Sequence, residues 1–124
     1  MNIDQFTALE SLLSDSPAVP KTRDIDTTLI GKKVIIRTYS AGVWFGVLEQ
    51  KNGAEVILAN ARRMYRWQCA ESITLSSVAT KGIDQTRSKI VGAVPAVWLE
   101  AIEIIPIVGA AAMSIETAPD VPAD

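Results

Sequence analysis

The segment VWFGVLEQKNGAEVILAN, residues 43–60, decides the fold because it holds two strand-like runs joined by a tight turn. Both runs are rich in β-branched, aromatic and aliphatic side chains, which suit the pleated surface of a sheet. Between them lie Asn52 and Gly53, a pair that favours a two-residue type I′ turn because both of its central positions need positive φ. The segment therefore predicts a β-hairpin.

The register of this hairpin puts apolar side chains on both of its faces. A turn at Asn52-Gly53 would place Val47 opposite Leu58 on one face and Leu48 opposite Ile57 on the other. Burial on two sides is typical of a closed barrel or of a sheet covered by another subunit. We therefore expect a small, strongly bent antiparallel sheet or barrel, and self-association into a homo-oligomer.

Further strands flank the hairpin on both sides. The run KVIIRTYSA, residues 33–41, has the same β-prone composition. Residues 89–107 contain two more such runs, broken near Pro95 and closed by Pro106. The sequence thus predicts a mainly β fold of the α+β type with about five strands.

Three helical segments complete the prediction. Residues 3–14 carry an apolar stripe at helical spacing, formed by Ile3, Phe6, Leu9, Leu12 and Leu13. After the third strand, Ser72 is suited to begin a short helix and Gly82 to end it. Residues 109–116 suit one or two further helical turns, whereas TAPDVPAD, residues 117–124, is typical of a disordered acidic tail.

These elements divide the chain into three parts. Residues 1–30 form an N-terminal helix and linker arm, residues 31–108 a β-rich core domain, and residues 109–124 a short helix with the acidic tail. Charge is also uneven along the chain, because residues 31–90 hold ten basic side chains against four acidic ones, whereas residues 91–124 hold five acidic side chains and no basic one. The flanking segments are acidic and bring the net charge to −2. They are either solvated tails or competitors for an anionic partner of the basic middle.

Composition argues against several classes of function. There is no histidine, and Cys69 is the only cysteine, so the common zinc sites and histidine-based triads are unavailable. No glycine-rich phosphate loop or nucleophile elbow occurs. We therefore expect no enzyme activity, no cofactor and no metal. The chain also lacks an apolar run of 18 residues and begins with an acidic segment, which favours a cytoplasmic protein without a membrane span.

The segment NARRMYRW, residues 60–67, is the candidate site. In an extended strand Arg63, Tyr65 and Trp67 share one face, while Arg62, Met64 and Arg66 share the other. An Arg/aromatic surface can stack a base and hold a phosphate, but it also suits an internal cation–π cluster or a protein interface. With side chains from the preceding strands, the predicted ligand-binding residues are Arg37, Tyr39, Trp44, Arg63, Tyr65 and Trp67.

Three blocks of the sequence resemble an uncharacterised family of small proteins from tailed phages and prophages. They are VIIRTYSAGVWFG (34–46), EVILANARRMYRW (55–67) and EAIEIIPI (100–107). The resemblance implies a phage accessory protein acting in the cytosol of an infected bacterium, without implying a catalytic residue. The run GVLEQKNGAEVIL, residues 46–58, is also similar to Sm-like and SH3-like small barrels, a likeness of fold only.

Two functions follow from these observations. The first is a non-enzymatic module that binds a phosphate-bearing ligand through the Arg/aromatic strand. That ligand would be a nucleotide, such as a sequestered host signalling nucleotide, or a short RNA. The second is a structural or interaction protein, a virion component or a binder of a host protein, that uses the same strand as an interface.

Overall fold

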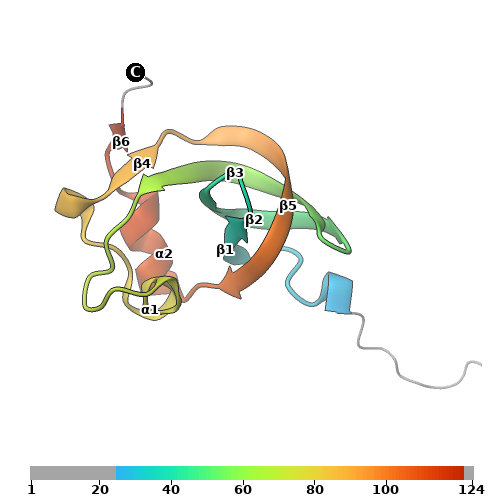
Figure 1. The fold of residues 1–124 in the computed structure, drawn as a ribbon, viewed down its shortest axis with the longest axis horizontal. Helices are drawn as coiled ribbons and strands as arrows, with labels where there is room; N and C mark the ends of the chain where they lie inside the picture. The colour runs from blue at the N-terminus through green and yellow to red at the C-terminus, as the bar shows by residue number, and fades with distance from the viewer. Residues whose placement is uncertain (1–24, 122–124) are drawn as a thin grey trace, which may run out of the picture.

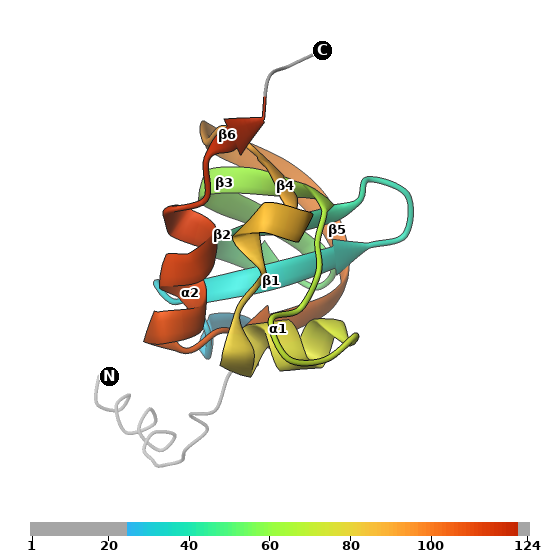
Figure 2. The same cartoon turned by 90° about the vertical axis from the view of Figure 1, so that its left-hand side faces the viewer.

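The computed structural model describes residues 25–121, and its ordered core is a ring of four strands with two helices on one side (Figures 1 and 2). The elements in chain order are η2 (Ile25–Thr27), β1 (Lys33–Thr38), β2 (Val43–Asn52), β3 (Glu55–Arg66), α1 (Leu75–Lys81), η3 (Gln85–Arg87), β4 (Lys89–Val91), β5 (Val94–Pro106), α2 (Gly109–Glu116) and β6 (Asp120–Val121). The expectation of a mainly β fold is confirmed. The helix predicted over residues 3–14 lies outside the described residues.

The ring closes because each of its strands pairs with two neighbours. β1 pairs with β2 and β5, and β3 pairs with the same two strands from the opposite side, all antiparallel. β4 continues the sheet from the far end of β3, and β6 pairs with β4 in parallel. The sheet is therefore mixed rather than purely antiparallel, and it has six strands.

Apolar residues on both faces of the strands fill two separate cores. One lies inside the ring and includes Val34, Ile36 and Leu48. The other lies between the ring and the helices and includes Ile35 and Phe45. Adjacent residues of β1 thus serve different cores, since successive side chains of a strand point to opposite faces. This arrangement explains the two-sided burial that the hairpin sequence predicts.

The hairpin between β2 and β3 is confirmed, but its turn lies one residue further along than predicted. Asn52 pairs with Glu55, so Gly53 and Ala54 form the two-residue loop. Among the described residues other than glycine, positive φ occurs only at Asn60, whereas Gly53 has φ of 62°. Positive φ at the first central position alone is characteristic of a type II′ turn, not of the predicted type I′.

The shifted turn and two irregularities change the predicted register. Leu48 pairs with Leu58 and Val47 with Ala59, because the pairing slips between Leu48 and Gln50 and again beyond Val47. Asn60, the residue with φ of 49°, lies in the second slip. Bulges of this kind increase the local twist, which lets four strands close into a ring.

The region after β3 differs from the prediction in two details. The N-cap of α1 is Thr74 rather than Ser72, and its Oγ1 accepts a hydrogen bond of 3.1 Å from the Ser77 amide. Gly82 ends the helix with φ of 84°, as predicted. Pro95 lies within β5 instead of breaking it; the break between the last two runs falls at residues 92–93, between β4 and β5.

The predicted disordered tail is wrong for residues 117–121. Ala118 is buried in the core beside the helices, and Asp120 and Val121 form β6 against β4. The acidic side chain of Asp120 also meets a buried cation, because Arg62 Nη2 lies 2.7 Å from its Oδ1. The composition of the segment indicates disorder, but these specific tertiary contacts hold it in place.

Candidate functional site

Arg62, the first arginine of a closely spaced group on β3, has a structural role. Its side chain is only 6% exposed and donates hydrogen bonds to backbone oxygens of two neighbouring segments. Nε bonds Val91 O at 2.8 Å, and Nη1 bonds Ile115 O and Ala118 O, both at 2.9 Å. These acceptors include carbonyls at the C-terminal end of α2, where a cation also favours the helix dipole. Arg62 therefore fastens the C-terminal segment to the sheet and cannot face a ligand.

Arg63 points to the opposite face of β3 and stacks on an aromatic ring. Its guanidinium carbon lies 4.8 Å from the ring centroid of Trp44, its direct partner on β2. Trp44 belongs to the core inside the ring, and its indole Nε1 donates to Ala41 O at 3.0 Å. The tryptophan is therefore a buried support for Arg63 rather than an exposed stacking surface.

A bulge in β3 gathers further cations beside Arg63. Met64 pairs with Ile90 and Arg66 with Lys89, so Tyr65 is an extra residue that has no counterpart on β4. Tyr65 is 70% exposed, and Arg66 and Lys89 are exposed as well. Tyr65 and Lys89 adjoin Met64 and Ile90, which point into the core beside the helices, so both project away from that core. We call Arg63, Tyr65, Arg66 and Lys89 the basic patch.

Like charges face each other in the basic patch. Arg66 lies directly opposite Lys89, an arrangement that destabilises an antiparallel pair by roughly 0.2–1 kcal/mol relative to uncharged side chains. Within residues 25–121, neither cation forms a salt bridge, whereas Lys33, Arg37, Lys51, Arg62 and Lys81 each do. The patch therefore concentrates positive charge that the described part of the chain does not neutralise by ion pairing.

The structure separates the other predicted site residues. Arg37 projects from β1 on the face opposite Ile36, and its Nε lies 2.8 Å from Glu103 Oε1. Tyr39 lies in the exposed loop between β1 and β2. Trp67 packs against the core beside the helices. Of the six predicted residues, the structure therefore brings Trp44 and Arg63 into contact, and Tyr65 lies two positions beyond Arg63 on β3.

The residues that sequence reasoning missed are Arg66 and Lys89. Strict alternation along β3 assigns Arg66 to the face of the buried Arg62, but the extra residue in the bulge leaves it exposed. Lys89 comes from another strand, and the sequence shows it only as one base among many. Its pairing with Arg66 depends on tertiary structure that no local pattern encodes.

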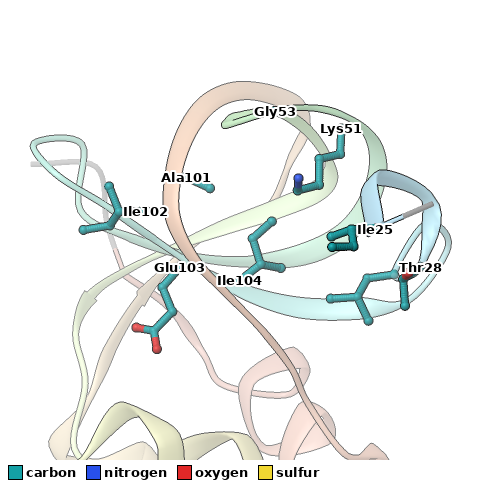
Figure 3. A pocket seen from close by; sticks show the side chains of 9 residues that line it. Ile25, Thr28, Lys51, Gly53, Ala101, Ile102, Glu103 and Ile104 are labelled. Atoms are coloured by element: carbon teal, nitrogen blue, oxygen red, sulfur yellow. The ribbon is translucent and has the colours of Figure 1, made fainter. Parts of the chain in front are cut away.

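A second surface lies beside β5, around a pocket of about 510 Å³ (Figure 3). The pocket lies between η2, the tip of the hairpin and β5, and is lined by Ile25, Thr28, Leu29, Lys51, Gly53, Ala101, Ile102, Glu103 and Ile104. A smaller hollow of about 200 Å³ shares Ala101 and Ile102 with it and continues to Trp98 and Tyr39. Trp98 is 71% exposed and Ile102 54% exposed. We call this region the β5 groove.

An ion pair lies beside the pocket. Lys51 Nζ lies 2.6 Å from Asp26 Oδ1, and this hydrogen bond lowers the pKa of the Asp26 carboxyl below its ordinary value. The same contact ties η2 to the hairpin. It fixes the position at which the chain reaches the β5 groove.

Two kinds of feature are absent from the part of the chain that the structure describes. Between Ile25 and Val121, no cluster of three acidic or cysteine side chains could hold a metal ion. In the same part of the chain, no helix is long and apolar enough to cross a membrane.

The fold and its surface define a small β-rich domain with a four-stranded ring, a cationic patch and an apolar groove. Residues 31–115 match the family described as "Domain of unknown function (DUF6948)", and the chain belongs to that family. The match begins just before β1 and ends within α2. No curated protein and no solved structure matches the chain significantly.

Proposed function

We propose that this protein is a non-enzymatic binding module that holds a phosphate-bearing ligand with an aromatic base, a nucleotide or a short RNA, on the basic patch. The observation that carries the proposal is the direct opposition of Arg66 and Lys89, two exposed cations with no salt bridge among residues 25–121. A bound phosphate would neutralise this repulsion, and hydrogen bonds from charged donors to phosphate are stronger than neutral ones.

Tyr65 supplies the second part of the recognition. Its ring is exposed beside Arg66 and on the same face of β3 as Arg63. Aromatic rings of this kind stack on bases, and each stack contributes roughly 1–3 kcal/mol. A phosphate held by Arg66 and Lys89 together with a base stacked on Tyr65 would use three of the four members of the patch. Arg63, already held on Trp44, adds a preorganised guanidinium.

Direct binding measurements test this function. Fluorescence anisotropy with a labelled single-stranded RNA of about eight nucleotides suits the length that small single-strand binders cover. Calorimetry with ATP and with inorganic phosphate distinguishes an oligonucleotide from a nucleotide and from an isolated phosphate. We expect affinity to fall as salt is raised, because the contacts release counterions.

Variants assign the binding to the patch. Replacing Arg66 and Lys89 by Ala should remove at least one charge-assisted contact of roughly 1.5–3 kcal/mol and weaken binding about tenfold or more. The matched control is Arg37→Ala, since Arg37 is a β1 cation already paired with Glu103. The proposal fails if none of these ligands binds at low salt, or if the control weakens binding as much as the double variant does.

A further inference from the structure

The outer face of β3 and β5 carries two carboxylates that lie opposite each other. Glu55 on β3 pairs directly with Glu100 on β5, and both side chains are exposed. The adjacent residues Val56 and Leu99 point into the core inside the ring, so the two carboxylates point away from it. Like charges in this position destabilise an antiparallel pair. Within residues 25–121 neither carboxylate forms a salt bridge, so the pair can accept a cation from outside.

An exposed aromatic ring lies beside the two carboxylates on the same face. Trp98 is 71% exposed and pairs with Ile57, and each of them lies two positions from a carboxylate on its own strand. Glu55 and Trp98 line a hollow of about 310 Å³, while Glu100 and Trp98 line a second hollow of about 200 Å³. We call Glu55, Ile57, Trp98 and Glu100 the acidic face. A cation can stack on such a ring and form an ion pair with the neighbouring carboxylates.

The cation beside the acidic face already has a partner. Lys51 lines the hollow that Glu55 and Trp98 share, but its Nζ lies 2.6 Å from Asp26 Oδ1. This ion pair holds Lys51 on η2, so the acidic face keeps its negative charge.

A cationic surface of matching design lies at the other end of β3. Glu55 is the first residue of this strand and Arg66 is the last, where it faces Lys89. β3 has 12 residues, so at about 3.3 Å per residue its ends lie roughly 36 Å apart along the strand. Figure 1 shows the hairpin and β4 at opposite ends of β3. The basic patch of one copy is therefore remote from its own acidic face.

We propose that the acidic face binds the basic patch of a second copy, so that copies of the chain associate head to tail. The two surfaces are complementary, because each has two like charges opposite each other across a strand pair and the signs differ. The contact brings the cations of one copy to Trp98 and the carboxylates of the next, and it relieves both repulsions. Because the two surfaces are different, the contact is heterologous and builds a ring or an open chain.

This association goes beyond the proposed function, because it needs no phosphate ligand. It uses the same basic patch, so a phosphate ligand and a second copy compete for it. The contact is small and its ion pairs are exposed, which is typical of weak and transient association. We therefore expect it to depend strongly on salt.

Sedimentation velocity of the full-length protein, without nucleotide or RNA, tests the association. The Debye length is about 30 Å in 0.01 M salt and about 3 Å in 1 M salt. At low salt the mean mass should exceed that of the monomer and grow with protein concentration, and at high salt the protein should be a monomer. A monomer under both conditions, or association that high salt does not weaken, would overturn the inference. Neither result would affect ligand binding to the basic patch, which is measured separately.

Two neutral variants test which surfaces meet. Glu55→Gln, Glu100→Gln removes the charge of the acidic face, and Arg66→Gln, Lys89→Gln reduces that of the basic patch. Each variant alone should be a monomer at low salt. An equimolar mixture should form a dimer with one copy of each and nothing larger, because each variant keeps the surface that the other lacks. Self-association of either variant alone, or a mixture that stays monomeric, would contradict head-to-tail contact.

The matched control is Glu71→Gln, Glu116→Gln. It changes the net charge by the same amount, but its two carboxylates are already paired with Lys81 and Lys33. It should associate like the wild type, and loss of association in this control would assign the effect to net charge instead of the acidic face.

A change at the aromatic ring tests the stacking. Trp98→Ala should weaken association about two- to fivefold, the amount that an exposed cation–π contact contributes. The fold should be retained because the Trp98 side chain is exposed. Unchanged association would place the contact elsewhere and overturn the inference.

Discussion

Arg62 Nη1 lies 2.9 Å from the carbonyl oxygen of Ile115, so the buried end of a β3 side chain caps the last turn of α2. The same guanidinium reaches Asp120 through Nη2 at 2.7 Å. A strand, a helix and the C-terminal segment therefore depend on one side chain. Neighbouring arginines of β3 therefore differ in their surroundings, because Arg62 is buried while Arg63 is exposed.

Arg62→Ala should destabilise the fold strongly. The substitution leaves several buried carbonyls without donors, and removal of one partner from a buried ionic cluster typically costs about 3–5 kcal/mol. Urea unfolding followed by circular dichroism measures the change. Arg66→Ala, an exposed change on the same strand, should stay within about 0.5 kcal/mol of the wild type. Equal stability of the two variants would contradict the role given to Arg62.

Removal of the residues after Thr117 should lower stability as well. The shortened chain loses β6, the buried Ala118 and the ion pair between Asp120 and Arg62. The truncation leaves donors of the buried Arg62 guanidinium without acceptors, and an unsatisfied buried donor costs about 1–3 kcal/mol. We expect the free energy of unfolding to fall by about this amount. The melting temperature of the shortened chain gives the test, and the single change Asp120→Asn should reproduce only part of the effect. An unchanged melting temperature would show that the tail is dispensable.

Gly46→Ala should lower the stability of the fold, because the ring interior has little free space at this position. A Cβ at this position would lie 2.8 Å from both Ala59 O and Leu58 Cγ, across the β2–β3 pair. Overpacking of this kind costs roughly 1–3 kcal/mol. Gly109→Ala is the control, because a Cβ there would meet no atom within 4 Å. In chemical denaturation, the unfolding midpoint of Gly46→Ala should be well below that of Gly109→Ala. Similar midpoints would mean that the ring interior has room for the added methyl group.

The ion pair at the groove predicts a titration. Because the Lys51 hydrogen bond lowers the pKa of Asp26 in the folded state, the pair stabilises the fold above the ordinary carboxyl pKa of 3.8. That contribution disappears as pH falls through the lowered value. In Lys51→Met, the pKa of Asp26 measured by NMR should rise toward 3.8. An identical pKa in wild type and variant would exclude the pair as the cause.

The features that local chemistry specifies could be predicted from the sequence. A hairpin centred on Gly53 and a helix that ends at Gly82 follow from the backbone freedom of glycine, and both are present. The apolar side chains on both faces of β2 also predict that the strand is buried on both faces. The register of the hairpin depends on the type of its turn. The turn lies at Gly53-Ala54 rather than at Asn52-Gly53, so the hairpin was easier to predict than its turn type.

Other features required tertiary information. The Arg/aromatic strand could be located, yet alternation could not reveal that Arg62 is enclosed by the C-terminal segment or that a bulge exposes Arg66. The order of residues 117–121 is a further example, because it comes from contacts with Arg62 and β4. Amino-acid composition carries no information on such long-range contacts, so residues 117–121 were predicted to be disordered.

The closed ring also has a consequence for the order in which the protein folds. Arg37 on β1 and Glu103 on β5 are neighbours although they are 66 positions apart in the chain. Until β5 has been synthesised, β1 and β3 are edge strands with unpaired backbone groups, which favour association with other chains. Contacts between residues so distant in sequence form slowly because a long loop must close first. The arrival of β5 covers both edges at once, so the nascent chain is most exposed to aggregation just before its last long strand emerges.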